Sequence, residues 1–297
     1  MILRLSTPTP AARRRRLSPA RVGLYAFLAT AAAFFLLPLY IMLVTSLKPL
    51  DEIRLGNIFA LPQAATFESW RAAWSTVCTG VSCEGIHGGF VNSLLIALPS
   101  TAIAIALGAL NGYALAFWRV RGAQLLFALL MLGAFVPLQV MIYPLVRVTA
   151  MLHVFGTLTG IVLVHVIFSM PVMTLLFRNY YAALPQELFN AARVDGGRFL
   201  RTFLHVVLPM SGPIIVVASI MQVTGVWNDY LLGLVFAGRD QLPMTVQLNN
   251  VINTTTGARL YNVNMAATIL TALVPLVLYF AAGRWFVRGI ATGAIKG

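Results

Sequence analysis

Residues 183–209 read ALPQELFNAARVDGGRFLRTFLHVVLP, a polar and basic segment that joins two long apolar stretches, 148–177 and 202–228. Neither stretch contains Asp, Glu, Lys or Arg, whereas the joining segment carries several charges. Charged side chains are costly inside a hydrocarbon layer. The sequence therefore predicts a structured loop between two membrane-spanning helices.

The first half of this segment carries the signals of a short helix over 186–194. Pro185 suits a helix start, and Glu187 lies in the first turn, where the helix dipole favours a carboxylate. Gly196-Gly197 then supplies a helix stop and a turn. The predicted apolar face consists of Leu188, Ala191 and Ala192.

The second half predicts another amphipathic stretch, and Pro209 marks the entry to the next span. One face holds Leu200, Phe203, Leu204, Val207 and Leu208, and the other holds Arg198, Arg201 and His205. Two short helices around a glycine break make a compact knob that can dock into a groove on a partner protein. By itself the pattern also suits a loop that lies on lipid headgroups.

The rest of the chain is as apolar as the flanks of this segment. Of 297 residues, 59% are hydrophobic and 10% are charged, against about 25% charged residues in a soluble domain. A helix that crosses a bilayer needs about 20 apolar residues. Six uncharged stretches meet this need: 22–47, 85–118, 122–146, 148–177, 202–228 and 260–283. We expect an all-α polytopic membrane protein with six transmembrane helices.

Two details of these stretches matter for the fold. Residues 241–258, QLPMTVQLNNVINTTTGA, are uncharged as well, but their many amides and hydroxyls predict an exposed loop. Prolines within the spans are expected to bend helices, as membrane bundles tolerate. These prolines are Pro137, Pro144, Pro171, Pro213 and Pro275.

The charges indicate the orientation of the chain. Six spans put both termini on one side, which then carries 15 basic residues and two acids, against six basic residues and five acids on the other. The positive-inside rule makes the termini cytoplasmic. The inside basic residues are Arg4, Arg13 to Arg16, Arg21, Arg119, Arg121, Arg178, Arg193, Arg198, Arg201, Arg284, Arg288 and Lys296. Because this charge is spread over separate loops, no nucleic-acid partner is expected.

Two features lie near the N-terminus. RRRRLSPAR before an apolar run imitates a secretory signal peptide, but 22–47 is too long for a signal core and five more spans follow, so we interpret it as an uncleaved first helix. Cys78 and Cys83 fall in the first outside loop, VCTGVSCEG. Their closeness on the oxidising side favours a local disulfide over two free thiols. No metal site is expected.

The 183–209 segment resembles the cytoplasmic signature of ABC importer permeases, E-A-A-x3-G-x9-I-x-L-P. The matching residues, with every spacing kept, are Asn190, Ala191, Ala192, Gly196, Val206, Leu208 and Pro209. P-x-E-L at 185–188 and Asp195 before Gly196 are typical of the carbohydrate-importing, maltose-permease-like branch. WNDY at 227–230 and RWFVRGIATGAIKG at 284–297 agree with that branch. The resemblance runs from about residue 22 to the end of the chain.

Two positions depart from the signature: Asn190 replaces the Glu and Val206 replaces the Ile. In the family the Glu pairs with a basic residue of the ATPase subunit. Asn190 forms hydrogen bonds but no salt bridge, so we expect docking with that contact altered. Val206 is a minor loss of volume.

The resemblance implies the type I ABC importer permease fold and a set of partners. These are a second homologous permease subunit, two ATPase subunits, an extracytoplasmic solute-binding protein, a sugar and membrane lipid, in a bacterial inner membrane. ATP and Mg would bind to the ATPase subunits, and this chain would bind no cofactor and catalyse no reaction. The implied coupling residues are Glu187, Asn190, Ala191, Ala192, Asp195, Gly196, Leu208 and Pro209. The implied ATPase-interface tail holds Gly289, Gly293 and Lys296.

The sequence also offers candidates for the sugar path, each with a structural alternative. They are Trp227, Asn228, Asp229, Gln139 and Asn92. Trp227 suits stacking on a sugar or an interfacial anchor. Asp229 suits a path-lining acid or a hydrogen-bonded helix end. The amides suit sugar binding or helix–helix hydrogen bonding.

The expected organisation is a basic cytoplasmic tail (1–21), a first helix (22–47), an extracytoplasmic loop (48–87), an ABC importer transmembrane domain (88–286) and a C-terminal tail (287–297). The domain includes a coupling loop (179–209) and an extracytoplasmic loop (237–262). Strings such as ALNGYALAFWR and YNVNMAA resemble permeases for glucose, mannose or related sugars. The alternative function is an ion- or proton-coupled secondary transporter, which works without an ATPase.

Overall fold

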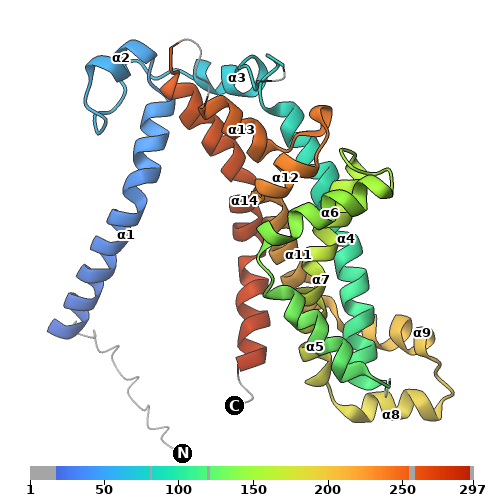
Figure 1. The fold of residues 1–297 in the computed structure, drawn as a ribbon. Helices are drawn as coiled ribbons and strands as arrows, with labels where there is room; N and C mark the ends of the chain where they lie inside the picture. The colour runs from blue at the N-terminus through green and yellow to red at the C-terminus, as the bar shows by residue number, and fades with distance from the viewer. Residues whose placement is uncertain (1–17, 81, 119–120, 254–257, 295–297) are drawn as a thin grey trace, which may run out of the picture.

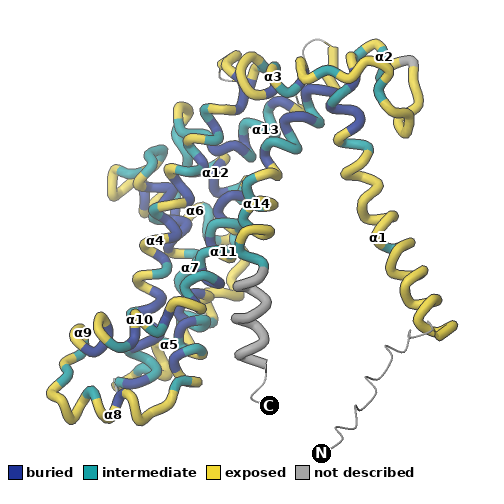
Figure 2. Tube along the Cα trace, turned by 180° about the vertical axis from the view of Figure 1, so that it is seen from behind, coloured by how far each residue is buried: buried dark blue, intermediate teal, exposed yellow. Residues whose placement is uncertain are grey.

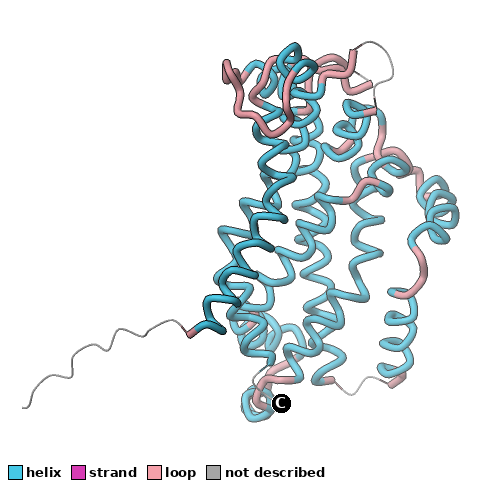
Figure 3. Tube along the Cα trace, turned by 90° about the vertical axis from the view of Figure 1, so that its left-hand side faces the viewer, coloured by secondary structure: helices cyan, strands magenta, loops and turns pink. Residues whose placement is uncertain are grey.

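The computed structural model describes residues 18–80, 82–118, 121–253 and 258–294, and the regular structure within these ranges is helical (Figure 1, Figure 3). Arg4, Arg13 to Arg16, Arg119 and Lys296 lie outside the described residues. The long helices are α1 (Pro19–Ser46), α4 (His87–Phe117), α5 (Ala123–Ala134), α6 (Leu138–Met151), α7 (Leu158–Ala182), α11 (Gly212–Asn228) and α14 (Tyr261–Ala294). The short ones are α2 (Leu50–Leu55), α3 (Glu68–Ser75), α8 (Gln186–Val194), α9 (Phe199–Thr202), a π-helical turn (Phe203–Val207), α10 (Leu208–Met210), α12 (Leu231–Phe236), a 3-10 turn (Arg239–Gln241) and α13 (Met244–Ile252).

Length and composition give six spans in the described residues if each of two bent helix pairs counts as one span. Among the described residues, α1, α4, α7 and α14 are each long and apolar enough to cross a membrane. The pair α5–α6 is bent by 108°, and the helical stretch 199–210 meets α11 at 79°. The bends expected at Pro137 and Pro213 therefore occur, and they are sharp enough to break the stretches 122–146 and 202–228 into separate helices. Pro137 precedes α6 and Pro213 lies in the first turn of α11, where proline is tolerated because those N–H groups need no helical partner.

The fourth span is shifted relative to the uncharged stretch at 148–177. α6 continues to Met151, His153 takes a left-handed φ of 56°, and α7 begins at Leu158. The Thr157 side chain caps α7, since its Oγ1 accepts a hydrogen bond from the Gly160 N–H at 3.2 Å. The lack of charged residues identifies 148–177 as apolar, but it does not reveal the turn between α6 and α7 inside that stretch.

Close packing of α4 on α7 forms the centre of the molecule. A Cβ added at Gly108 would lie 2.6 Å from Met173 Cβ, and one at Gly112 would lie 2.6 Å from the Arg178 backbone nitrogen. Both distances are too short for a real side chain, so glycine is what allows the two backbones to approach. α4 and α7 thus pack as one unit.

The short elements gather at the two ends of this bundle (Figure 1). α8 and α9 lie at one end, together with the N-terminal end of α1 and the C-terminal end of α14; we call this the α8 end. α2, α3 and α13 lie at the other, the α3 end. The arrangement matches an even number of spans.

α1 stands apart from the bundle over most of its length. It meets α14 near its C-terminal end and diverges from it toward Pro19 (Figure 2). Only Val44, Thr45 and Ser46 of α1 are buried. Near this junction Trp70 Nε1 donates to Ser46 Oγ at 3.1 Å, and Asn262 Nδ2 donates to the Lys48 carbonyl at 3.1 Å. The remaining apolar surface of α1 is uncovered in the single chain.

The exposed loop expected over 241–258 is wrong in its first half. Residues 244–252 form α13, which packs on α4 and α14 and buries Met244, Val246 and Val251. Its amides have partners within the protein: Gln247 Oε1 accepts from the Gly89 N–H at 3.0 Å, and Asn249 Oδ1 accepts from Tyr230 Oη at 3.2 Å. The polar composition reflects internal hydrogen bonds rather than exposure to solvent.

Candidate functional site

The helix expected over 186–194 is α8, and it ends where the glycines predict. The Asp195 N–H donates to the Ala191 carbonyl, and Gly196 has φ +73°. The Gly197 N–H then donates to the Ala192 carbonyl at 2.8 Å. A Cβ at Gly197 would lie 2.5 Å from that carbonyl oxygen, whereas one at Gly196 meets nothing within 4 Å. Gly196 is needed for its conformation and Gly197 for close approach.

The face of α8 that packs on the bundle differs from the expected one. Leu188 and Ala191 are exposed and Ala192 is half-buried. Phe189 is buried instead, and its ring stacks on Phe117 at the end of α4 with ring centroids 3.4 Å apart. A helix of nine residues allows apolar side chains on two sides, so residue spacing alone did not identify Phe189 as the buried one. The signal that could have identified it is that Phe189 is the aromatic residue of this helix.

Arg193 provides a second attachment that sequence reasoning missed. Its Nη2 donates to the Phe117 carbonyl at 2.7 Å, and its guanidinium lies 5.8 Å from the Trp118 ring centroid. The last carbonyls of a helix lack partners inside the helix and attract cations. Arg193 therefore closes the end of α4 and fixes α8 against it.

The segment after α8 is only half packed on the bundle. Phe199 and Phe203 lie 4.9 and 5.5 Å from Tyr113 between ring centroids, and Val207 is buried. Leu200 and Leu204 are 60% and 52% exposed, so the predicted single apolar face is wrong. Its residues divide between the bundle and the outside because α9 and the π-helical turn lie at the bundle edge.

The α8 end thus presents a supported, protruding surface. Its exposed residues include Glu187, Leu188, Asn190, Ala191, Val194, Asp195, Gly196, Leu208 and Pro209. Val194 is 87% exposed. A short helix with exposed apolar side chains and a rigid base suits insertion into a groove of another protein. Within the described residues, no group of three His, Cys, Asp or Glu side chains is placed to hold a metal.

Asn92 joins helices at the α3 end. Its Nδ2 donates to the carbonyls of Asp240 and Leu242 at 3.1 and 3.2 Å. The neighbouring Ser93 Oγ accepts from the Met244 N–H at 2.9 Å. These bonds hold the start of α13 on the first turns of α4. Asn92 therefore has the structural role of hydrogen bonding between elements, not a free amide for a sugar.

Trp227 and Asp229 are also engaged within the chain. Trp227 is 1% exposed, and its Nε1 donates to the Thr271 carbonyl at 3.0 Å, so it presents no face to a sugar or to a membrane interface. Asp229 Oδ2 accepts from the Gly233 N–H at 2.9 Å and caps α12. Asn228 and Gln139 are exposed, Gln139 next to the α5–α6 bend. These candidates do not converge on one site.

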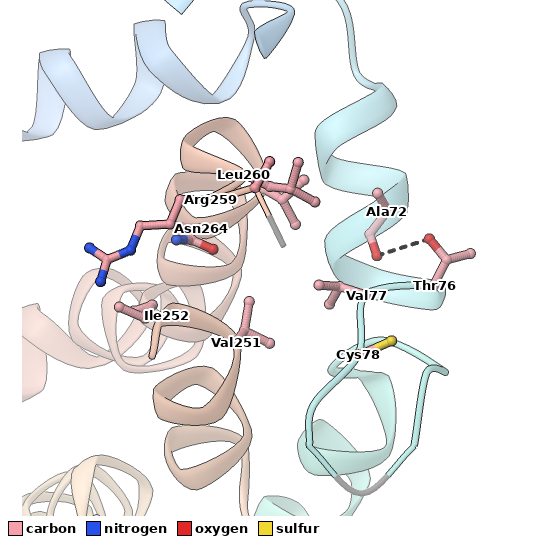
Figure 4. Close-up of a pocket in the computed structure, with 11 residues that line it drawn as sticks. Ala72, Thr76, Val77, Cys78, Val251, Ile252, Arg259, Leu260 and Asn264 are labelled. Atoms are coloured by element: carbon pink, nitrogen blue, oxygen red, sulfur yellow. Dashed lines mark hydrogen bonds between the residues drawn. The ribbon is translucent and has the colours of Figure 1, made fainter. Parts of the chain in front are cut away.

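A cavity of about 300 Å³ lies at the α3 end, between the loop that follows α3 and the facing ends of α13 and α14 (Figure 4). Thr76, Val77 and Cys78 line one wall, and Arg259 and Asn264 lie on the other. A disulfide joins Cys78 to Cys83 in the loop beside this cavity.

At the C-terminus, α14 continues to Ala294, so Gly289 and Gly293 of the expected tail are helical.

Comparison with known proteins assigns the chain to a family. The osmoprotective compounds uptake permease protein GgtD of Synechocystis sp. is 40% identical over 215 residues, which cover 72% of each chain. The alpha-glucoside transport system permease protein AglG of Rhizobium meliloti is 37% identical over 224 residues, 73% of this chain and 58% of that protein.

The fold has a counterpart among solved structures. A chain in the crystal structure of a bacterial ABC transporter that imports the acidic polysaccharide alginate matches with a TM-score of 0.73, covering 94% of this chain and 99% of that one at 16% identity. This likeness concerns the fold alone. The family of binding-protein-dependent transport system inner membrane components matches residues 89–292, well over half of the sequence. The chain therefore belongs to that family of inner-membrane transport components.

Proposed function

We propose that this chain is the membrane-spanning permease subunit of an ATP-driven sugar importer and forms half of the translocation path. The observation that carries the proposal is the exposed surface of α8, held on the bundle by Phe189 and Arg193, in a chain of this transport family. A secondary transporter needs no such docking surface, and the family membership argues against that alternative.

The proposed partners follow from the surfaces that the single chain leaves uncovered. A groove in each ATPase subunit would receive α8 of one permease subunit, and the ATPases would bind ATP and Mg and hydrolyse the nucleotide. A second homologous permease subunit would cover the other half of the path and part of the exposed α1. A solute-binding protein would dock at the α3 end, where Arg259 and the cavity of Figure 4 lie.

The proposed orientation places the α8 end and both termini in the cytoplasm of a bacterial inner membrane. Arg193, Arg198 and Arg201 lie at that end, and Asp51, Glu52 and Glu68 belong to elements of the α3 end. The positive-inside rule supports this assignment. Asn190 would then meet the ATPase subunit through hydrogen bonds alone, because it lacks the charge of the family glutamate.

The proposed substrate is glucose, mannose or a related sugar. Support comes from the local strings shared with permeases for such sugars and from the similarity to an alpha-glucoside permease. Selectivity would rest with the binding protein and the partner subunit, because Asn92, Trp227 and Asp229 are engaged within this chain.

The proposal is tested by purifying the tagged chain from its native membrane and reconstituting what co-purifies into vesicles. We expect an ATPase subunit and a second permease subunit to co-purify. Sugar uptake should require both ATP and the solute-binding protein. Uptake that persists without ATP and collapses with the ion gradient would instead establish the secondary transporter.

A further inference from the structure

We infer that α4 mechanically links the ATPase-docking helix α8 to α13 at the opposite end of the molecule, with Phe189, Arg193 and Asn92 as the positioning residues. The inference rests on the proposed function, because it describes how the docking surface would act on the distant end. It gives these three side chains a positioning role, although none of them belongs to the signature motif.

The first link is at the α8 end. Phe189 stacks on Phe117, and Arg193 donates to the carbonyl of the same residue. One residue of α4 is thus held by both a ring contact and a charged hydrogen bond, and Trp118 flanks the guanidinium. A hydrogen bond to a charged group is stronger than a neutral one, so a displacement of α8 carries the end of α4 with it.

The second link is α4 itself. It is a continuous helix of 31 residues, whereas two other spans are broken. From Ser93 to Phe117 it reaches about 36 Å at the usual helical rise. Gly108 and Gly112 bring its backbone against α7, which also leads directly into α8. Each helix contains an interior proline, Pro99 in α4 and Pro171 in α7, but the close backbone packing at Gly108 and Gly112 holds the two helices together between their ends.

The third link is at the α3 end, where four hydrogen bonds join the first turns of α4 to α13 and its approach. Asn92 supplies two of them, and Ser93 and the Gly89 N–H supply one each. A Cβ at Gly89 would lie 2.5 Å from Gln247 Oε1 and 2.9 Å from Met244 Cα, so the two elements meet at the closest approach that glycine permits.

These three links form one continuous chain of contacts from α8 to α13. A shift of α8 against the rest of the chain must break the Arg193 contact or move α4, and a moving α4 must break the Asn92 contacts or move α13. The Arg193 bond to Phe117 and the Asn92 bond to Leu242 are partly buried and so are worth more than a surface hydrogen bond, whereas the Asn92 bond to Asp240 is exposed. Movement at the ATPase would thereby reach the end of the molecule where a solute-binding protein docks.

The inference is tested by hydrogen–deuterium exchange in the purified complex, with and without a non-hydrolysable ATP analogue. In the native complex we expect the analogue to change amide exchange within 244–252. Arg193→Met and Asn92→Ala should each abolish that change and lower uptake about tenfold, as expected for the loss of one charged hydrogen bond or of two neutral ones, while the ATPase subunit stays bound. Arg193→Lys should restore part of the response, because it keeps a charged donor.

Arg201→Met, an exposed arginine one segment away, and Val91→Ala, an exposed neighbour of Asn92, are the matched controls and should respond like the native protein. A nucleotide-dependent change at 244–252 that survives Arg193→Met and Asn92→Ala would overturn the link while leaving the proposed function intact. An Arg201→Met variant as impaired as Arg193→Met would overturn it too. A chain that retains no ATPase subunit would contradict the proposed function and this inference together.

Discussion

At the scale of single residues, the α8 end depends on side chains that the family signature does not specify. Asn190, Ala191 and Gly196 follow the signature spacing and are exposed, so they are free to meet a partner. Phe189 and Arg193 lie between and beside them and point to the bundle. The segment thus carries two interleaved sets of residues, one that faces outward and one that fixes the helix.

Gly196 and Gly197 are needed in the same turn for different physical reasons, so substitutions at the two positions should have different effects. Gly196 has φ +73° and open space around it, so Gly196→Val should cost about 1–3 kcal/mol of backbone strain, and Gly196→Asn should be close to neutral. We expect Gly196→Val to insert normally but to lose ATPase association or sugar uptake in vesicles matched for expression. Normal uptake by that variant would show that the helix stop is dispensable.

At the scale of elements, the uncharged apolar stretches predicted which segments are helical and their prolines predicted where two of them bend, but neither signal predicted how the helices pack. The six apolar stretches correspond to six spans, because the need to satisfy backbone groups in lipid leaves helix as the solution. Both breaks lie beside prolines that the sequence marks as bends, Pro137 and Pro213, whereas the angles of 108° and 79° depend on how neighbouring elements pack. The α13 helix was missed for a related reason, since its amides find partners far away in the sequence.

For the candidate site too, the sequence predicted local features but not contacts between distant residues. The bounds of α8 and its glycine stop follow from local signals, namely Pro185, Glu187 and the glycine pair. Phe189 and Arg193 were missed because their partner, Phe117, is about 70 residues away in the sequence. Trp227 looked available for a sugar because its partner, Thr271, is 44 residues away in the sequence. For Asp229 the structure shows the hydrogen-bonded alternative, with a partner, Gly233, only four residues away.

The loop after α3 provides a prediction at this scale. Cys78 and Cys83 are bonded in the structure, beside backbone hydrogen bonds from the Thr79 N–H to the Ser82 carbonyl and from the Gly85 N–H to the Val77 carbonyl. We expect mass spectrometry of non-reduced, alkylated protein to find the pair linked. Reduction should remove about 2 kcal/mol of stabilisation from this loop, as expected for a short closed loop. Two alkylated thiols in natively purified protein would contradict the bond.

At the scale of the whole molecule, the chain is an incomplete unit. α1 leaves most of its apolar surface uncovered, α8 protrudes from one end, and α14 extends to Ala294, beyond the uncharged stretch that Arg284 ends. In the proposed complex, lipid, a second permease subunit and an ATPase subunit would cover these surfaces. The molecule is therefore best understood as one part of an assembly.

The C-terminal tail tests that view. Deleting residues 290–297 leaves Arg284 and Arg288, which suffice to anchor the last span at the membrane surface. We expect the shortened chain to insert normally, while ATPase retention or ATP hydrolysis coupled to uptake falls, because the tail reaches the ATPase interface in the proposed complex. A shortened chain that assembles and transports like the full chain would reduce the tail to a basic flank.

The most direct test of an ATPase-docking α8 is photo-crosslinking from its outward face in the intact complex. A photoreactive amino acid at Val194, which is 87% exposed, should form an adduct with the ATPase subunit. The same group at Leu95, which is 50% exposed on α4 and far from α8, is the matched control and should form none. Absence of the ATPase adduct at Val194, in a complex that still contains the ATPase, would contradict docking through α8.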